Sequence, residues 1–372
     1  MPDSGFSGFV GRMQQICRGM RPINSSGNPR TSAKNLIDYA KISENRRIMN
    51  SMKMRAAVLA GPRQLIVTEI VPPEPKSDEV CVQLEGCGVC ASNLSPWEGK
   101  PWFSYPMEPG APGHEGWGVV HSIGAHVAEF QPGDRVGLLS LHGFAEFDIA
   151  NRNAIVKLPD ALDGRPFPAE PLGCGINVFR RAGIEKGDTV AIVGVGFLGA
   201  VVLRLAALAG ATVIAITRRR KGLQIAKHYG AVECLPMEDH SQVINRVKEL
   251  TGGRFCEVVV EATGKQWPVD LSAELTAVRG RLVVAGYHQD GPRQVNMQLW
   301  NWRGLDVINA HERDLEVYRL GMQAAVDLVA TGGLDPTPLY THFYPLDKIE
   351  EAFEATANRP DGFMKALVMF SG

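Results

Sequence analysis

The feature that most constrains the fold of this chain is a glycine-rich turn between a strand pattern and a helix pattern. Residues 189–194 read "TVAIVG", a short apolar run typical of a buried strand, and "FLGAVVLRLAALAG" at 197–210 has the pattern of a helix. The turn between them carries Gly194, Gly196 and Gly199 as a G-x-G-x-x-G. In this setting, the first two glycines let the backbone approach a pyrophosphate, and the third lets the helix pack on the sheet. We therefore predict a dinucleotide site at this turn.

The residues around the turn continue an alternation of strands and helices. Phe197 and Leu198 complete the motif and open the helix, so we include both among the cofactor-binding residues. The pattern then predicts strands at 212–217, 232–235, 256–262 and 281–287, separated by helices at 219–229, 241–250 and 269–278. Such alternation is typical of α/β proteins. We predict a Rossmann domain, with a doubly wound parallel sheet, over residues 176–314.

The preceding part of the chain has a different pattern. Residues 53–175 contain short β-runs such as "EVCVQLEGCGV" and "GWGVVHSIG", separated by Gly- and Pro-rich turns. Closely spaced strands of this kind predict a small, irregular β-barrel. The tail, residues 315–372, is too short to form a core alone, and we expect it to pack on that barrel as part of one catalytic domain.

Residues 1–52 differ again. They are basic and contain several serines, which fits either a targeting leader or a disordered extension before a fresh start at Met52. Seven scattered cysteines do not form a disulfide framework and favour a reducing compartment. We expect a cytoplasmic protein, with organellar targeting by the extension as the alternative.

Charge and hydropathy exclude two classes of partner. The formal net charge is −1, so no overall field attracts nucleic acid or an anionic membrane. The apolar run at 190–216 contains glycines and a second β-rich burst, which favours strand–turn–helix–strand over a membrane span. We predict neither nucleic acid nor membrane as a partner.

The end of the second Rossmann strand indicates which dinucleotide binds. An NAD site usually has an acidic residue there to accept from the ribose 2′-hydroxyl. This chain instead has Thr217, Arg218 and Arg219, followed by two further cations. Guanidinium groups would bind a 2′-phosphate, although a solvated basic helix start is the alternative. We predict NADP(H) rather than NAD(H), with Thr263, at the end of the strand 256–262, also beside the cofactor.

A second motif carries potential metal ligands. Cys87 and Cys90 form a C-x-x-C, and His114 and Glu115 follow. A redox dithiol would need the pair at a helix N-terminus, and a zinc knuckle would need a second pair of ligands nearby. Neither condition is met, so we predict a metal site assembled across the fold, with Cys90 and His114 as its first two ligands.

These motifs together resemble a known family. "GCGVCASN", "PGHEGWGVV", "QPGDRV", "EPLGCGINVFRRAG" and "VVVEATG" are similar, in order, to segments of the zinc-dependent medium-chain dehydrogenase/reductase superfamily. The resemblance implies a GroES-like barrel, a Rossmann domain and one catalytic zinc per chain. It implies no second zinc, because "GDRVGLLSLHGFAEF" leaves no room for the four-cysteine lobe that binds a structural zinc in some members.

The resemblance also implies roles for individual residues. Cys90 matches the zinc thiolate, His114 the zinc imidazole, and Glu115 an acidic residue that ligates zinc directly or in exchange with water. The third protein ligand would be Glu170, as in the polyol branch, with Cys174 as the alternative. 

Two further positions next to Cys90 matter for the site. Ser92 matches the hydroxyl that relays the substrate proton. Asn93 stands where the family commonly has an Asp that orients the histidine ligand. An Asn can still accept a hydrogen bond, but its missing charge would weaken metal binding or shift the electronics of the metal.

The resulting expectation is a zinc-dependent oxidoreductase acting on a secondary alcohol of polyol, cyclitol or sugar type, or on its ketone. A zinc-free quinone or enoyl reductase of the same fold and a non-catalytic NADPH-binding protein are the alternatives. By resemblance alone, we expect a homodimer or homotetramer, formed through an edge strand near 304–310. Trp97, Trp102, Phe103 and Tyr105 are expected either to border the substrate cleft or to pack in the core.

Overall fold

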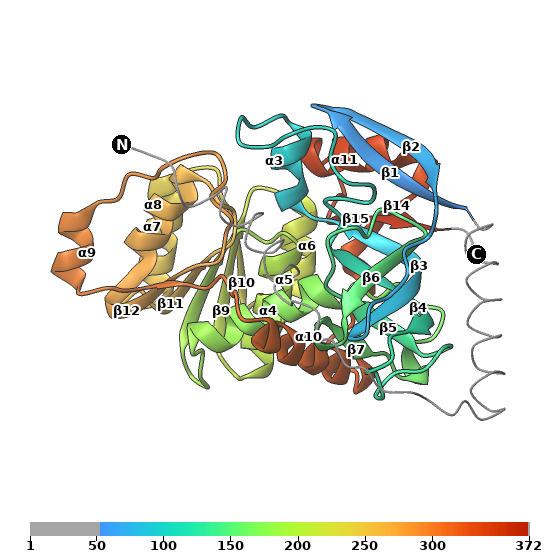
Figure 1. Ribbon diagram of the computed structural model, residues 1–372. Helices are drawn as coiled ribbons and strands as arrows, with labels where there is room; N and C mark the ends of the chain where they lie inside the picture. Colours follow the sequence, from blue (N-terminus) through green and yellow to red (C-terminus); the bar gives the residue numbers. More distant parts are fainter. Residues whose placement is uncertain (1–52, 371–372) are drawn as a thin grey trace, which may run out of the picture.

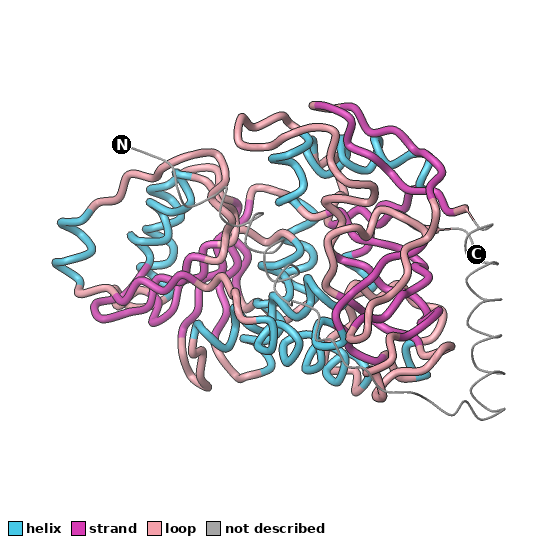
Figure 2. Tube along the Cα trace, viewed as in Figure 1, coloured by secondary structure: helices cyan, strands magenta, loops and turns pink. Residues whose placement is uncertain are grey.

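The computed structural model describes residues 53–370. Its strands form two large groups, separated by a layer of helices (Figures 1 and 2). The predicted leader or extension at residues 1–52 lies outside the described residues. Among the helices that the structure describes, none is long and apolar enough to span a membrane.

The first large sheet has six parallel strands in the order β10-β9-β8-β11-β12-β13. Its strands are β8 (Thr189–Val193), β9 (Thr212–Thr217), β10 (Glu233–Pro236), β11 (Cys256–Glu261), β12 (Thr276–Val284) and β13 (Asp306–Asn309). The connecting helices are α5 (Phe197–Leu208), α6 (Arg220–His228), α7 (His240–Leu250), α8 (Gln266–Leu275) and α9 (Met297–Arg303). This order, with the first strand central, is that of a Rossmann fold and confirms the predicted fold class. We call it the nucleotide sheet.

One predicted helix of this region lies later in the sequence than the helix that the structure shows. The predicted helix at 269–278 begins at Gln266 and ends at Leu275, and Thr276 already starts β12. Pro268 lies in the first turn, where a missing N–H breaks no helical hydrogen bond. The β-branched Thr276 and Val278 favour the strand that follows.

The second large sheet contains seven strands, six of them in the order β14-β15-β3-β4-β5-β7, while β6 also pairs with β3. These strands are β3 (Glu79–Val89), β4 (Glu115–Ile123), β5 (Arg135–Leu138), β6 (Phe147–Asn151), β7 (Ile155–Lys157), β14 (Tyr340–Pro345) and β15 (Lys365–Met369). A hairpin of β1 (Met54–Gly61) and β2 (Gln64–Ile70) lies beside it. β15 pairs antiparallel with β3, so the C-terminal segment completes the sheet that the N-terminal segment begins. Together they form the GroES-like part of the fold, which we call the barrel.

Within residues 53–370, four α-helices and five short 3₁₀ helices accompany the barrel. The α-helices are α3 (Leu94–Trp97), α4 (Ala169–Ala182), α10 (Leu315–Ala330) and α11 (Ile349–Asn358). The 3₁₀ helices are η1 (Ala91–Asn93), η2 (Arg152–Ala154), η3 (Asp160–Leu162), η4 (Thr337–Leu339) and η5 (Leu346–Lys348).

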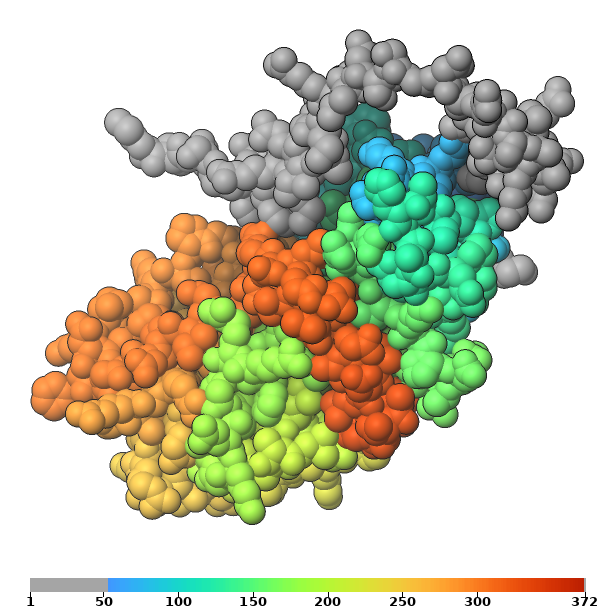
Figure 3. All heavy atoms as spheres, turned by 60° about the horizontal axis from the view of Figure 1, so that its bottom comes forward, coloured from blue at the N-terminus to red at the C-terminus, as the bar shows by residue number. Residues whose placement is uncertain are grey.

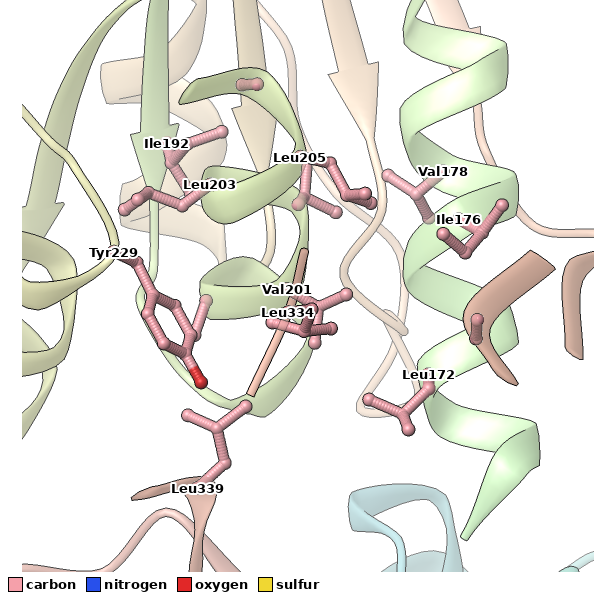
Figure 4. Close-up of a cluster of buried hydrophobic side chains, with 14 of the residues drawn as sticks. Leu172, Ile176, Val178, Ile192, Val201, Leu203, Leu205, Tyr229, Leu334 and Leu339 are labelled. Carbon is pink, nitrogen blue, oxygen red and sulfur yellow. The ribbon is translucent and has the colours of Figure 1, made fainter. Parts of the chain in front are cut away.

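Helix α4 joins the two parts of the molecule. It packs against both α5 and α10, and a Cβ on Gly173 would lie 2.7 Å from the backbone nitrogen of Met322, so only glycine permits this approach. Figure 4 shows Leu172 and Ile176 of α4 in one apolar cluster with Val201 of α5. In Figure 3, the orange to red segment that contains α10 lies between the yellow-green nucleotide-sheet side and the blue-green barrel side. The domain division at 175/176, which falls inside α4, stays a prediction.

Candidate active site

The structure brings three potential metal ligands together at the ends of two paired strands. Cys90 directly follows β3, and Glu115 opens β4, with Gly88 of β3 opposite Glu115 in the antiparallel ladder. The donor atoms of Cys90, His114 and Glu115 all lie within 4.8 Å of one another. Among the described residues this is the one group of three such side chains that could hold a metal ion. Thiolate, imidazole and carboxylate are the ligands that zinc prefers, so the donor set fits a zinc ion.

The histidine ring is oriented by the backbone rather than by a carboxylate. His114 Nδ1 lies 3.0 Å from the carbonyl oxygen of Pro112 and 3.3 Å from Asn93 Nδ2. The amide of Asn93 donates to the same Pro112 oxygen at 2.9 Å and accepts from the Cys90 backbone N–H at 2.8 Å. With Nδ1–H donated to Pro112, Nε2 is the nitrogen left for a metal ion. Asn93 therefore links the Cys90 backbone to the Pro112 carbonyl. That carbonyl provides the acceptor for the histidine ring that an acidic residue would otherwise supply.

The electrostatics of the group also favour a cation. Burial lowers the pKa of His114, but the hydrogen bond and charge of Cys90, with the charges of Glu170 and Glu115, raise it to about 10. A proton on the imidazole thus balances an excess of acidic groups. A divalent cation would balance the same charge and leave the imidazole free as a ligand.

A buried lysine that we did not predict completes this charge cluster. Lys365, the first residue of β15, places Nζ 2.7 Å from Glu115 Oε1, and both side chains are at least nine-tenths buried. Burial lowers the pKa of Lys365, but the charge and hydrogen bond of Glu115, together with the charges of Cys90 and Glu170, raise it. The signal in the sequence was a single charge inside the apolar run "FMKALVMF".

Glu170 and Cys174 lie one helical turn apart at the start of α4. The Cys174 thiol donates to Glu170 Oε1 at 3.1 Å, and its sulfur lies close to Tyr318 of α10. Burial raises the pKa of both Glu170 and Cys174, and Glu170 further raises that of Cys174. Glu170 interacts electrostatically with His114, but it is not in the close group with Cys90, His114 and Glu115.

Ser92 faces the same centre from η1. Its Oγ lies 3.5 Å from His114 Nε2, the nitrogen assigned above to the metal. A hydroxyl at this position can contact a substrate oxygen held beside the ion. Cys87, by contrast, is fully buried against Gly143, and burial raises its thiol pKa well above the usual value.

The glycine-rich turn has the open surface that a pyrophosphate needs. Gly194, at φ 101°, follows β8, and a Cβ on Gly199 would collide with the Gly194 carbonyl oxygen. A Cβ on Gly196 would meet only Arg219 Nη2, at 3.6 Å, so the space in front of it is otherwise clear. Phe197, the first residue of α5, stacks on Tyr340 with ring centroids 6.1 Å apart, and Leu198 follows it, half-buried.

The residues after β9 lie beside this turn. Thr217 is buried at the end of the strand, Arg218 is exposed, and Arg219 is half-buried. Burial, followed by the charge of Arg359, lowers the pKa of Arg219 to about 10. Among the residues that the structure describes, no carboxylate forms an ion pair with Arg218 or Arg219.

Thr263 lies where β11 ends, held by a buried carboxylate. Its backbone N–H donates to Glu261 Oε1 at 2.7 Å, and Glu261 Oε2 lies 3.0 Å from His288 Nε2. Burial opposes ionisation of Glu261, but the hydrogen bonds from His288 and Thr263 lower its pKa. The network fixes the carboxyl edge of the nucleotide sheet, at which cofactors bind in this fold.

A glutamine that we did not predict links the two parts of the fold. Gln289, in the loop after β12, accepts from Ser95 Oγ at 2.7 Å and donates to the Ala91 carbonyl at 3.0 Å. Both partners belong to the segment that follows Cys90. The link joins residues almost 200 positions apart, and no sequence pattern pointed to it.

The four aromatic residues predicted to lie at the cleft or in the core have different environments in the structure. Trp97 is fully buried, packs on Phe353 and donates to Glu350, so it belongs to the barrel core. Trp102 is exposed, while Phe103 and Tyr105 are half-buried. His142 lies half-exposed beside the buried Asp148.

Comparisons with known proteins agree with this architecture. The family model described as "Alcohol dehydrogenase GroES-like domain" matches residues 76–160, and "Zinc-binding dehydrogenase" matches residues 198–330. Sorbitol dehydrogenase of Ovis aries is 28% identical over 337 residues, covering 80% of this chain and 92% of that protein.

Solved structures show the same fold. A putative zinc-binding dehydrogenase from Sinorhizobium meliloti, determined bound to NADP, has a TM-score of 0.73 and 27% identity, covering 86% of this chain and 99% of that one. The structure of galactitol-1-phosphate dehydrogenase from Escherichia coli matches with a TM-score of 0.74 and 23% identity. The match covers 85% of this chain and 99% of that one, and at this identity it supports the fold alone. The chain belongs to the zinc-dependent medium-chain dehydrogenase/reductase superfamily, as its motifs predicted. It is an oxidoreductase of the alcohol-dehydrogenase type.

Proposed function

We propose that this protein interconverts a secondary alcohol of polyol, cyclitol or sugar type and its ketone, with one zinc ion and NADP(H). The observation that carries the proposal is the convergence of Cys90, His114 and Glu115 on one point, with Ser92 beside it. The similarity to sorbitol dehydrogenases supports the polyol class, and the arginines after β9 support NADP(H).

Four side chains of this chain would bind the metal ion. Cys90, His114 and Glu115 hold the metal, and Glu170 is a further ligand from the start of α4. A zinc ion there would act as a Lewis acid on a substrate oxygen, while a bound nicotinamide would exchange hydride with the carbon. Lys365 donates to the Glu115 carboxylate and so fixes its position beside the other two ligands.

Other residues of the site transfer the proton and bind the cofactor. Ser92 Oγ accepts the proton of the substrate hydroxyl as it releases its own hydroxyl proton outward to solvent. The glycine turn and Thr263 place the dinucleotide along the carboxyl edge of the nucleotide sheet, with Thr217, Arg218 and Arg219 at its ribose end.

Initial rates on a panel of polyols, cyclitols and simple secondary alcohols, each with NADP⁺ and NAD⁺, test the proposal. We expect turnover of a polyhydroxylated secondary alcohol with higher kcat/KM for NADP⁺. Ser92→Ala should lower kcat about 10²–10⁴-fold, whereas Ser77→Ala, an exposed serine before β3, should not. Activity only on quinones or enones would favour the zinc-free reductase, and absence of turnover on every substrate would favour a binding protein.

Two substitutions test the role of Glu170. Zinc content should fall in Glu170→Gln and stay at the wild-type level in Cys174→Ala. The reverse pattern would assign the ligand to Cys174.

We also propose that the chain forms a homodimer or homotetramer through the β13 edge of the nucleotide sheet. Val278 and Trp302 near this edge are 70% and 87% exposed. Such exposure of large apolar side chains is typical of an interface. Light scattering after size exclusion should give a multiple of the chain mass, reduced by Trp302→Ser, and a wild-type monomer would contradict the proposal.

A further inference from the structure

The loop between α11 and β15 brings an arginine of the barrel to the ribose end of the dinucleotide site. Arg219 Nη1 donates to the Phe363 carbonyl, which ties the residues after β9 to this loop. The loop begins at Arg359, directly after α11. The charge of Arg218 acts on Arg359, and that of Arg359 acts on Arg219, so three guanidinium groups gather from the two parts of the fold.

This cluster has no internal charge balance. Among residues 53–370, no carboxylate forms an ion pair with any of the three arginines. Burial and the charge of Arg218 lower the pKa of Arg359, although its side chain retains a solvent-exposed surface. Burial and the charge of Arg359 likewise lower the pKa of Arg219. Like charges held together without a counterion indicate a place for an anion.

The cluster lies beside the glycine turn, and Arg359 itself occupies a left-handed backbone position. Arg359 has φ 48° at the C-cap of α11, a left-handed position that usually holds glycine or asparagine. A residue with a Cβ has an unfavourable backbone conformation there. Since Arg219 Nη2 borders Gly196 in the glycine turn, an anion in the cluster would lie next to the bound dinucleotide.

We propose that Arg359 binds the 2′-phosphate of NADP(H) together with Arg218 and Arg219, so that one phosphate is held from both parts of the fold. This inference rests on the proposed use of NADP(H). Because Arg359 belongs to the barrel, the phosphate also links the barrel to the nucleotide sheet, which an NAD(H) ribose would not do.

Titration calorimetry with 2′,5′-ADP and 5′-AMP tests the proposal, since the two ligands differ by the phosphate in question. Arg359→Gln should weaken 2′,5′-ADP about tenfold or more and leave 5′-AMP unchanged. The control is Arg279→Gln, which replaces another exposed arginine with a left-handed backbone, φ 58°, in β12. It should bind both ligands as the wild type does.

The outcomes separate the two proposals. If the wild type binds 2′,5′-ADP no better than 5′-AMP, both the NADP(H) preference and the role of Arg359 are wrong. If the wild type prefers 2′,5′-ADP and Arg359→Gln retains that preference, the role of Arg359 alone is wrong. Equal weakening of both ligands by Arg359→Gln would also overturn the role, because it would show a general disturbance of the cofactor site.

Discussion

The buried pair of Lys365 and Glu115 gives a prediction about stability. Their side chains are 5% and 1% exposed, and Nζ lies 2.7 Å from Oε1. Lys365→Met removes the cation and leaves a buried carboxylate uncompensated. Breaking such a pair from one side destabilises a protein by about 3–5 kcal/mol, a large share of a total of about 5–15 kcal/mol.

The assay is guanidinium unfolding of the metal-free protein at pH 7, with a chelator present. Lys365→Met should lower the free energy of unfolding by about 3–5 kcal/mol. Lys53→Met is the control, because its partner Glu69 lies 3.1 Å away on the surface, and exposed pairs contribute little. The double variant Lys365→Met/Glu115→Gln should recover much of the loss, since neither member of the pair then leaves an unpaired charge. A loss in Lys365→Met no greater than in Lys53→Met would refute the reasoning.

Two further perturbations test other parts of the account. Burial raises the pKa of Asp148 to about 6, so the folded state keeps a proton that the unfolded chain releases, and stability falls as pH rises from about 4 to about 6. Urea titrations measure the free energy of unfolding of Asp148→Asn and of the wild type. The variant should gain about 2–3 kcal/mol relative to the wild type over that pH window. A difference between the two proteins that does not change with pH would show that Asp148 titrates normally. Gln289→Ala removes both hydrogen bonds to the segment after Cys90, so hydrogen–deuterium exchange at residues 91–97 should rise while that of β12 stays constant. Unchanged exchange at 91–97 would mean that other contacts hold the segment.

The nucleotide sheet was predictable from local patterns. Each strand and helix has its own period, and the glycine turn marks the first crossover, so the order of elements follows without knowledge of long-range contacts. The shift of α8 shows the limit of this approach. A proline in a first turn can belong to the helix as readily as precede it, and only the packed structure decides.

The candidate site was predictable only where its residues are close in sequence. Cys90 and His114 flank strands that pair directly, and their types limit the chemistry they can perform. Lys365 reaches Glu115 because β15 pairs with β3, a contact across some 250 positions that no local pattern encodes. Glu115 and Glu170 are the two carboxylates that could lie close to Cys90. The position of Glu170 depends on how α4 packs on α10, so sequence spacing does not show which of the two is closer.

Zinc content of the purified protein, by elemental mass spectrometry, tests the central claim most directly. We expect about one zinc per chain in the wild type, loss of zinc in Cys90→Ser, and wild-type content in Cys234→Ser, which alters another half-buried thiol in the nucleotide sheet. Zinc that persists in Cys90→Ser, or a wild type that contains none after purification without chelators, would contradict a catalytic metal centre at Cys90, His114 and Glu115.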